Sequence, residues 1–110
     1  MAYDERLADR VREVIPLGLD LTEKKMFGGL AFLVGGKMSV AVSGQGGLLV
    51  RVDPERTDAL AGRKGASIAI MRGRPANGWL RVEADAARTK RQLEFWVDIG
   101  LAQARSLPAT

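Results

Sequence analysis

The stretch Thr22-Glu-Lys-Lys-Met-Phe-Gly-Gly-Leu-Ala-Phe-Leu-Val-Gly-Gly-Lys-Met38 decides the fold of this chain of 110 residues. Its two Gly-Gly pairs, at 28–29 and 35–36, bracket an apolar run. Glycine reaches positive φ without steric cost, so both pairs predict changes in chain direction. We therefore predict one strand over residues 23–34, kinked or bulged at Gly28-Gly29, and then a hairpin turn at Gly35-Gly36.

Further strands are predicted from the alternation of apolar and polar residues after this turn. They span residues 38–43, 48–52, 67–71 and 79–83, and residues 72–78 form a long turn. Side chains predicted to face the core include Met38, Val40, Val42, Ile68 and Ile70. The opposite face of the sheet then carries Ala31, Leu33, Ser39, Ala41, Leu49, Arg51, Ala69, Met71, Trp79 and Arg81.

Three helices accompany these strands. Asp4 can cap the first, over residues 4–15, and Asp53-Pro54-Glu55 begins the second, which ends at Gly62. The third spans residues 86–105. The resulting order, α-β-β-β-α-β-β-α, has short turns between consecutive strands, which predicts an antiparallel sheet. We expect a single α+β domain over residues 1–110, with two layers, a five-stranded antiparallel sheet and the helices on one face.

The composition restricts the chemistry of this chain. It has 46% hydrophobic and 27% charged residues, as soluble globular proteins do, and it contains no cysteine and no histidine. Disulfides, thiolate nucleophiles, Ser-His-Asp triads and nearly all transition-metal sites are thereby excluded. Caps and solvated faces explain the acidic residues of the first two helices. We predict no enzymatic activity, no catalytic residue, no metal and no cofactor.

The same composition indicates a compartment. No apolar run approaches the roughly 20 residues that a membrane span needs, and no signal-peptide pattern opens the sequence. A chain without cysteine suits a reducing environment. We expect a cytoplasmic protein without membrane contact.

A basic charge balance makes nucleic acid an alternative partner. The net charge is +4, but the 17 basic residues are scattered along the chain. Residues 72–75, Arg-Gly-Arg-Pro, match the core of the AT-hook, whose arginines enter the minor groove. Because the tetrapeptide occurs once and a turn sequence follows it, we favour a hairpin. The alternative nucleic-acid surface would use Arg51, Trp79 and Arg81 of the sheet, with Arg72, Arg74, Lys24 and Lys25.

Two surfaces are predicted to meet proteins. The sheet face that carries Arg51, Trp79 and Arg81 among small apolar side chains suits an unidentified regulatory partner. On the last helix, a second apolar stripe lies nearly opposite the core stripe and consists of Phe95, Ile99 and Ala102. One stripe suffices to dock a helix on a sheet. We therefore expect the second stripe to contact an identical chain across a two-fold axis, giving a homodimer.

The residues Glu23-Lys-Lys-Met-Phe-Gly-Gly-Leu-Ala-Phe32 resemble the signature of the N-terminal domain of the TfoX/Sxy family. Three further segments resemble that family in the same order: Leu49–Glu55, Gly73–Pro75 and Leu101–Pro108. The resemblance implies a two-layer α+β fold similar to secretion chaperones, in a bacterial protein linked with competence regulation. It offers no catalytic residues to carry over.

The competence regulators of that family resemble a two-domain protein with a second, helical C-terminal domain. This sequence stops at Thr110, so we expect a short stand-alone member without that domain. The regulators' suggested role, assisting the cyclic-AMP receptor protein at promoters, is therefore not transferred. The hypothesis that results is a cytoplasmic, non-enzymatic regulatory module that acts through protein contacts.

Overall fold

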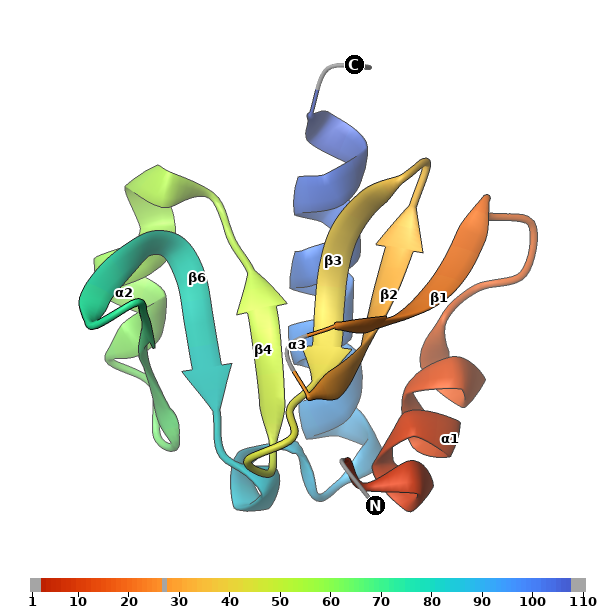
Figure 1. Cartoon of the computed structure of the whole chain (residues 1–110), viewed down its shortest axis with the longest axis horizontal. Coiled ribbons are helices and arrows are strands. Elements are labelled where there is room, and N and C mark those ends of the chain that lie inside the picture. The colour runs from red at the N-terminus through yellow and green to blue at the C-terminus, as the bar shows by residue number, and fades with distance from the viewer. Residues whose placement is uncertain (1–2, 27, 108–110) are drawn as a thin grey trace.

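The computed structural model describes residues 3–26 and 28–107, which form one sheet with helices packed on one of its faces (Figure 1). The sheet has six antiparallel strands in the order β1-β2-β3-β4-β6-β5. The predicted α+β architecture with an antiparallel sheet is confirmed. The strands are β1 (Leu21–Met26), β2 (Gly29–Val34), β3 (Lys37–Val42), β4 (Leu48–Arg51), β5 (Ala66–Met71) and β6 (Arg74–Val82).

The helices cover the face of the sheet that carries the main core (Figure 1). In the described residues they are α1 (Glu5–Val14), α2 (Thr57–Ala61) and α3 (Lys90–Ser106), and single 3-10 turns at Pro54–Arg56 and Ala84–Ala87 precede the last two. The Asp4 carboxylate accepts from the backbone N–H groups of Arg6 and Leu7, so the predicted cap is confirmed. No helix among the described residues is long and apolar enough to cross a membrane.

The third helix begins at Lys90 rather than at residue 86 as predicted. Thr89 and Gln92 form a capping box, in which each side chain binds the backbone N–H of the other residue. This arrangement satisfies N–H groups that the first turn of a helix leaves without partners. The preceding residues, Ala84–Ala87, turn as a separate 3-10 segment.

The prediction of five strands is wrong because the first predicted strand is two strands. Met26 pairs with Gly29 across a tight hairpin, and Gly28 has a φ of 75° there. Gly29 itself is not in the left-handed region, but a Cβ atom at this position would collide with the carbonyl oxygen of Val42 on β3. The first glycine thus permits a turn, and the second lets two strands approach closely.

A β-bulge in β3 overturns the predicted orientation of Met38. Phe32 of β2 pairs with Val40 and Leu33 pairs with Met38, so Ser39 is the extra residue. The Ser39 hydroxyl is buried and donates to the carbonyl oxygen of Phe32 at 2.8 Å. Since the bulge inserts one residue into the alternation, Met38 packs with Ala31 and Ala41 on the face without helices.

The predicted long turn over residues 72–78 is also wrong. Only Arg72 and Gly73 separate β5 from β6, and both have positive φ, as two-residue hairpins of the tightest type require. The hairpin interpretation of the Arg-Gly-Arg-Pro segment is confirmed. The pairing register of β5 with β6 shifts between Ile68 and Ile70 of β5. Ile70 is 65% exposed instead of lying in the core.

Helix α3 touches strand β3 at a glycine. A Cβ atom at Gly100 of α3 would lie 2.5 Å from the carbonyl oxygen of Ser39, the bulged residue of β3. Nothing larger than hydrogen fits between this turn of the helix and the strand. The bulge and the glycine therefore form one contact, which sets how closely α3 packs on the sheet.

Replacing Gly100 with Ala should destabilise the protein by about 1–3 kcal/mol, because the added methyl group overpacks this contact. In an unconstrained helix the same change would stabilise by roughly 1 kcal/mol. Gly62→Ala is the matched control, since a methyl group there meets no atom closer than 3.4 Å. The free energy of unfolding measured in urea decides the sign. A Gly100→Ala protein as stable as the wild type would contradict the contact.

An ion pair ties α1 to the edge strand β1. The Arg12 guanidinium donates to both carboxylate oxygens of Glu23, at 2.6 and 2.7 Å, and also contacts Asp9. The central carbon of this guanidinium lies 5.9 Å from the centroid of the Phe32 ring. The hydrogen bonds from Arg12 lower the pKa of the Glu23 carboxyl below its ordinary value.

A lowered folded-state pKa means that the Glu23 carboxylate stabilises the fold above its ordinary pKa, and that this contribution is lost as the pH falls through the lowered value. Because both side chains are about one third exposed, we expect about 0.2–1 kcal/mol near neutral pH. Urea unfolding of the wild type and Glu23→Gln should differ at pH 7, and the difference should begin to shrink below about 4.5 and vanish once the pH is below the lowered pKa of Glu23. A difference that is constant with pH would contradict the pairing.

Candidate functional site

The sheet face opposite the helices carries a second, smaller apolar cluster. We call it the helix-free face. Ala31, Met38 and Ala41 are its buried centre. Met26, Leu33, Leu49 and Trp79 pack against them and stay partly exposed. Residues paired directly across antiparallel strands share a face, so Arg81 opposite Leu49 and Arg51 opposite Trp79 belong to it as well. Ten residues were assigned to this face from the alternation, and the exception among them is the bulged Ser39.

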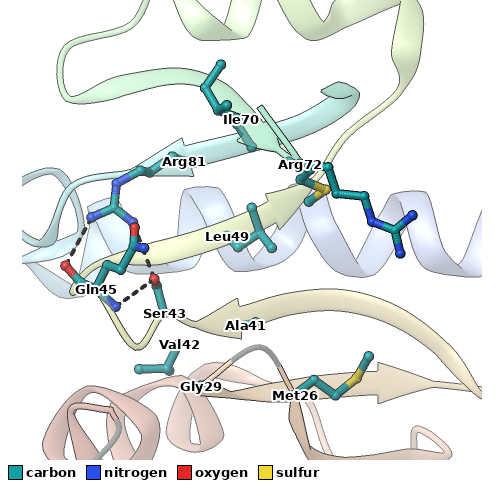
Figure 2. Close-up of a pocket in the computed structure, with 12 residues that line it drawn as sticks. Met26, Gly29, Ala41, Val42, Ser43, Gln45, Leu49, Ile70, Arg72 and Arg81 are labelled. Atoms are coloured by element: carbon teal, nitrogen blue, oxygen red, sulfur yellow. Dashed lines mark hydrogen bonds between the residues drawn. The ribbon is translucent and has the colours of Figure 1, made fainter. Parts of the chain in front are cut away.

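This face is concave, because the two edges of the sheet curl toward each other across it. In Figure 1 the end of β1 crosses in front of β2 and β3, on the side away from α3. Met26 of β1 and Met71 of β5, at opposite edges of the sheet, line the same groove. The groove has a volume of about 480 Å³ (Figure 2).

The lining of the groove divides into an apolar floor and a polar end. Figure 2 shows Leu49 and Ala41 between Met26 on one side and Ile70 on the other, with Arg81, Ser43 and Gln45 gathered at one end. Among the described residues no Asp or Glu lines it. The full lining is Met26, Gly29, Ala41, Val42, Ser43, Gln45, Leu49, Ala69, Ile70, Met71, Arg72 and Arg81.

Arg81 is held in place at the polar end of the groove. Its two terminal nitrogens donate to the Ser43 hydroxyl at 3.3 Å and to the carbonyl oxygen of Gln45 at 3.1 Å. Ser43 also accepts from the backbone N–H of Gln45, so the turn after β3 is tied to the arginine (Figure 2). These partners are neutral, and the positive charge of Arg81 is therefore oriented but not balanced.

Arg51 and Trp79 form a second unit of this face. The Arg51 guanidinium carbon lies 4.9 Å from the centroid of the Trp79 ring, and one terminal nitrogen donates to the carbonyl oxygen of Met38 at 3.4 Å. A cation over an indole ring is stabilised by the electrons of the ring face. The arginine thereby covers one face of the aromatic ring that the sequence offered for base stacking.

The predicted basic residues separate into different places. Lys24 pairs with Ala31 and shares the helix-free face, whereas Lys25 pairs with Leu30, a main-core residue, and shares the other side. Arg72 lines the groove, and Arg74 lies next to it, outside the lining. At the described strand positions of the helix-free face, all charged residues are cations. Within residues 3–26 and 28–107, the ion pairs found are those of Arg12 with Asp9 and Glu23.

The second apolar stripe of α3 packs against the main core to a greater extent than predicted. Phe95 and Ile99 are half-buried against the main core, and Phe95 meets Trp96 edge-to-face at 5.0 Å between centroids. The Arg63 guanidinium covers the Phe95 ring at 4.1 Å. Ala102 is the exposed member of the stripe. Whether these residues contact an identical chain stays a prediction.

Some residues that complete the groove were not predicted from the sequence to lie at a site. Met26 and Gln45 come from the tips of two hairpins, and Ile70 was assigned to the core. No local pattern joins these positions, because the curvature of the whole sheet brings them together. Chemically the groove offers apolar contact and cationic hydrogen-bond donors. In the described part of the chain no three acidic side chains gather as they would to hold a metal ion.

Comparison with known proteins identifies the family of this chain. A search of curated proteins finds none that matches this chain. The family described as the TfoX N-terminal domain matches residues 16–104 of the 110, which span α2, all six strands and nearly all of α3. The resemblance seen in the opening glycine motif is thereby confirmed. The chain belongs to the TfoX N-terminal domain family.

Proposed function

We propose that this protein is a non-enzymatic, cytoplasmic regulatory module that binds an acidic protein partner on the helix-free face. The observation that carries the proposal is the charge of that face. Lys24, Arg51 and Arg81 surround an apolar centre, and no acidic residue stands among the described strand positions there. An apolar patch with a rim of one charge favours a partner surface of the opposite charge. Membership of the TfoX N-terminal domain family supports a regulatory role.

Nucleic acid remains the alternative partner, and the structure supports it less. Folds that bind single strands present several aromatic rings with free faces, on which successive bases stack. Here the face carries Trp79, and Arg51 covers that ring. The Arg72-Gly73 segment forms a tight hairpin rather than the extended chain that would lie in a minor groove. A protein partner would also cover the partly exposed apolar side chains of this face, such as Leu33 and Leu49, with which a phosphate backbone makes no favourable contact.

The proposal is tested by charge reversal outside the groove. We expect Lys24→Glu/Arg51→Glu to lose a protein that the wild type captures from a nuclease-treated lysate of the host cell. Arg6→Glu/Arg105→Glu is the matched control, because it makes the same charge change at exposed sites on α1 and α3. Quantitative mass spectrometry of the captured proteins, followed by binding of the purified candidate, measures the loss.

Three outcomes would count against the proposal. The captured protein could bind the double variant and the wild type equally, or it could depend on nucleic acid in the lysate. Duplex or single-stranded DNA could also bind the pure protein at low micromolar concentration in physiological salt. Binding that weakens steeply as salt rises would then identify phosphate contacts, because they release counterions. Either nucleic-acid result would favour nucleic acid over a protein as the partner.

Self-association through α3 is a separate proposal. It is supported by the exposed Ala102 and by the parts of Phe95 and Ile99 that solvent reaches. Substituting Phe95 would disturb the core, so Ala102→Glu is the informative change, and Ala59→Glu on the exposed side of α2 is its control. We expect the wild type and Ala59→Glu to sediment as dimers at tens of micromolar, and Ala102→Glu as a monomer. A wild type that sediments as a monomer would refute the homodimer.

A further inference from the structure

We propose that the groove on the helix-free face is a binding site for a small amphipathic carboxylate, with one carboxyl group on an unbranched or aromatic apolar body. The proposal goes beyond the partner surface and does not depend on it. Lys24 and Arg51, which test the partner surface, do not line the groove. The anchor proposed here is Arg81, which does.

The size and the lining of the groove suit a small organic ligand. Its volume of about 480 Å³ falls within the range of roughly 300–1,000 Å³ that is usual for such sites. The floor is aliphatic, with Ala41, Leu49 and Ala69 between Met26 and Met71. Methionine side chains are flexible and polarizable, so the two that flank the floor can close on ligands of different shape.

The polar end selects the charge of the ligand. Arg81 is fixed by bonds to the Ser43 hydroxyl and the Gln45 carbonyl, which engage two of its N–H groups. A guanidinium has five N–H groups in a planar fork, and a carboxylate accepts two parallel bonds from such a fork. Because no Asp or Glu of the described chain lines the groove, an entering carboxylate finds no competing anion. A cationic ligand would meet repulsion from Arg81 and Arg72.

Geometry also sets where the two parts of the ligand lie. Arg81 is at one end of the groove, beside the turn after β3, and the apolar floor extends from it toward Met26 and Ile70 (Figure 2). The carboxylate would bind at Arg81, and the apolar body would cover Leu49 and Ala41. An ordered arginine loses less conformational freedom on binding than a mobile one, which strengthens the carboxylate contact.

The experiment is an NMR titration of the ¹⁵N-labelled full chain at neutral pH with octanoate, octan-1-ol and octylammonium as probes. We expect octanoate to shift the amide signals of Ala41, Leu49 and Met71, with octanol at least about tenfold weaker because it lacks the charge-assisted bonds. Octylammonium should leave these signals in place. Arg81→Gln should reduce octanoate binding to the level of octanol, while Arg51→Gln, outside the groove, should keep it.

Several results would overturn the proposal. One is the absence of shifts at the groove up to about 10 mM octanoate, a concentration at which even millimolar affinity would be visible. Another is equal binding of octanoate and octanol to the wild type, a comparison that holds even if Arg81→Gln folds poorly. A third is octanoate binding that Arg81→Gln leaves unchanged. Since Lys24→Glu/Arg51→Glu should still bind octanoate, failure of the groove and failure of the partner surface can be told apart.

Discussion

The contact between Gly100 of α3 and the carbonyl oxygen of Ser39 on β3 is the constraint on which the rest of this structure depends. The carbonyl oxygen of the bulged Ser39 lies against the helix, and the missing side chain at Gly100 makes room for it. The same bulge shifts the alternation of β3, so that Val40 and Val42 enter the main core while Met38 joins the opposite face. One local irregularity thus sets the packing of the two layers and the composition of both faces.

The two faces of the sheet consequently differ in burial and in composition. The helix-covered face holds the main core, which includes Phe32, Leu48, Leu80 and Trp96 and is almost wholly buried. The helix-free face surrounds a small buried apolar centre with partly exposed apolar side chains and with two arginines that neutral partners orient. Burying a charge without a partner is costly, whereas a half-buried arginine held by carbonyl groups keeps part of its hydration and a fixed direction. Such a surface suits the anionic partner and the carboxylate that we propose.

Our proposal of recognition rather than reaction rests on the division of the sheet and on the chemistry of the residue types present. Catalysis at neutral pH usually relies on a group that exchanges protons there, and this chain has neither histidine nor cysteine. The groups gathered on the helix-free face are guanidinium, hydroxyl and amide, which bind and orient anions. The partner proposal and the carboxylate proposal both rest on this chemistry and share Arg81, but the partner proposal is tested at Lys24 and Arg51, which lie outside the groove.

The sequence by itself determined the α+β class, the antiparallel sheet, the caps at Asp4 and Asp53, and the position of Arg51, Trp79 and Arg81 on one face. These features depend on residues close in the chain, whose spacing records helix and strand periods. Tertiary structure alone decided the number of strands, the place of Met38 and Ile70, and the groove. A glycine pair is compatible with a bulge or a hairpin, and the pairing of Met26 with Gly29 across the sheet shows that it forms a hairpin. Met26 and Met71 lie in strands at opposite edges of the sheet, and only the curvature of the whole sheet brings them to one site.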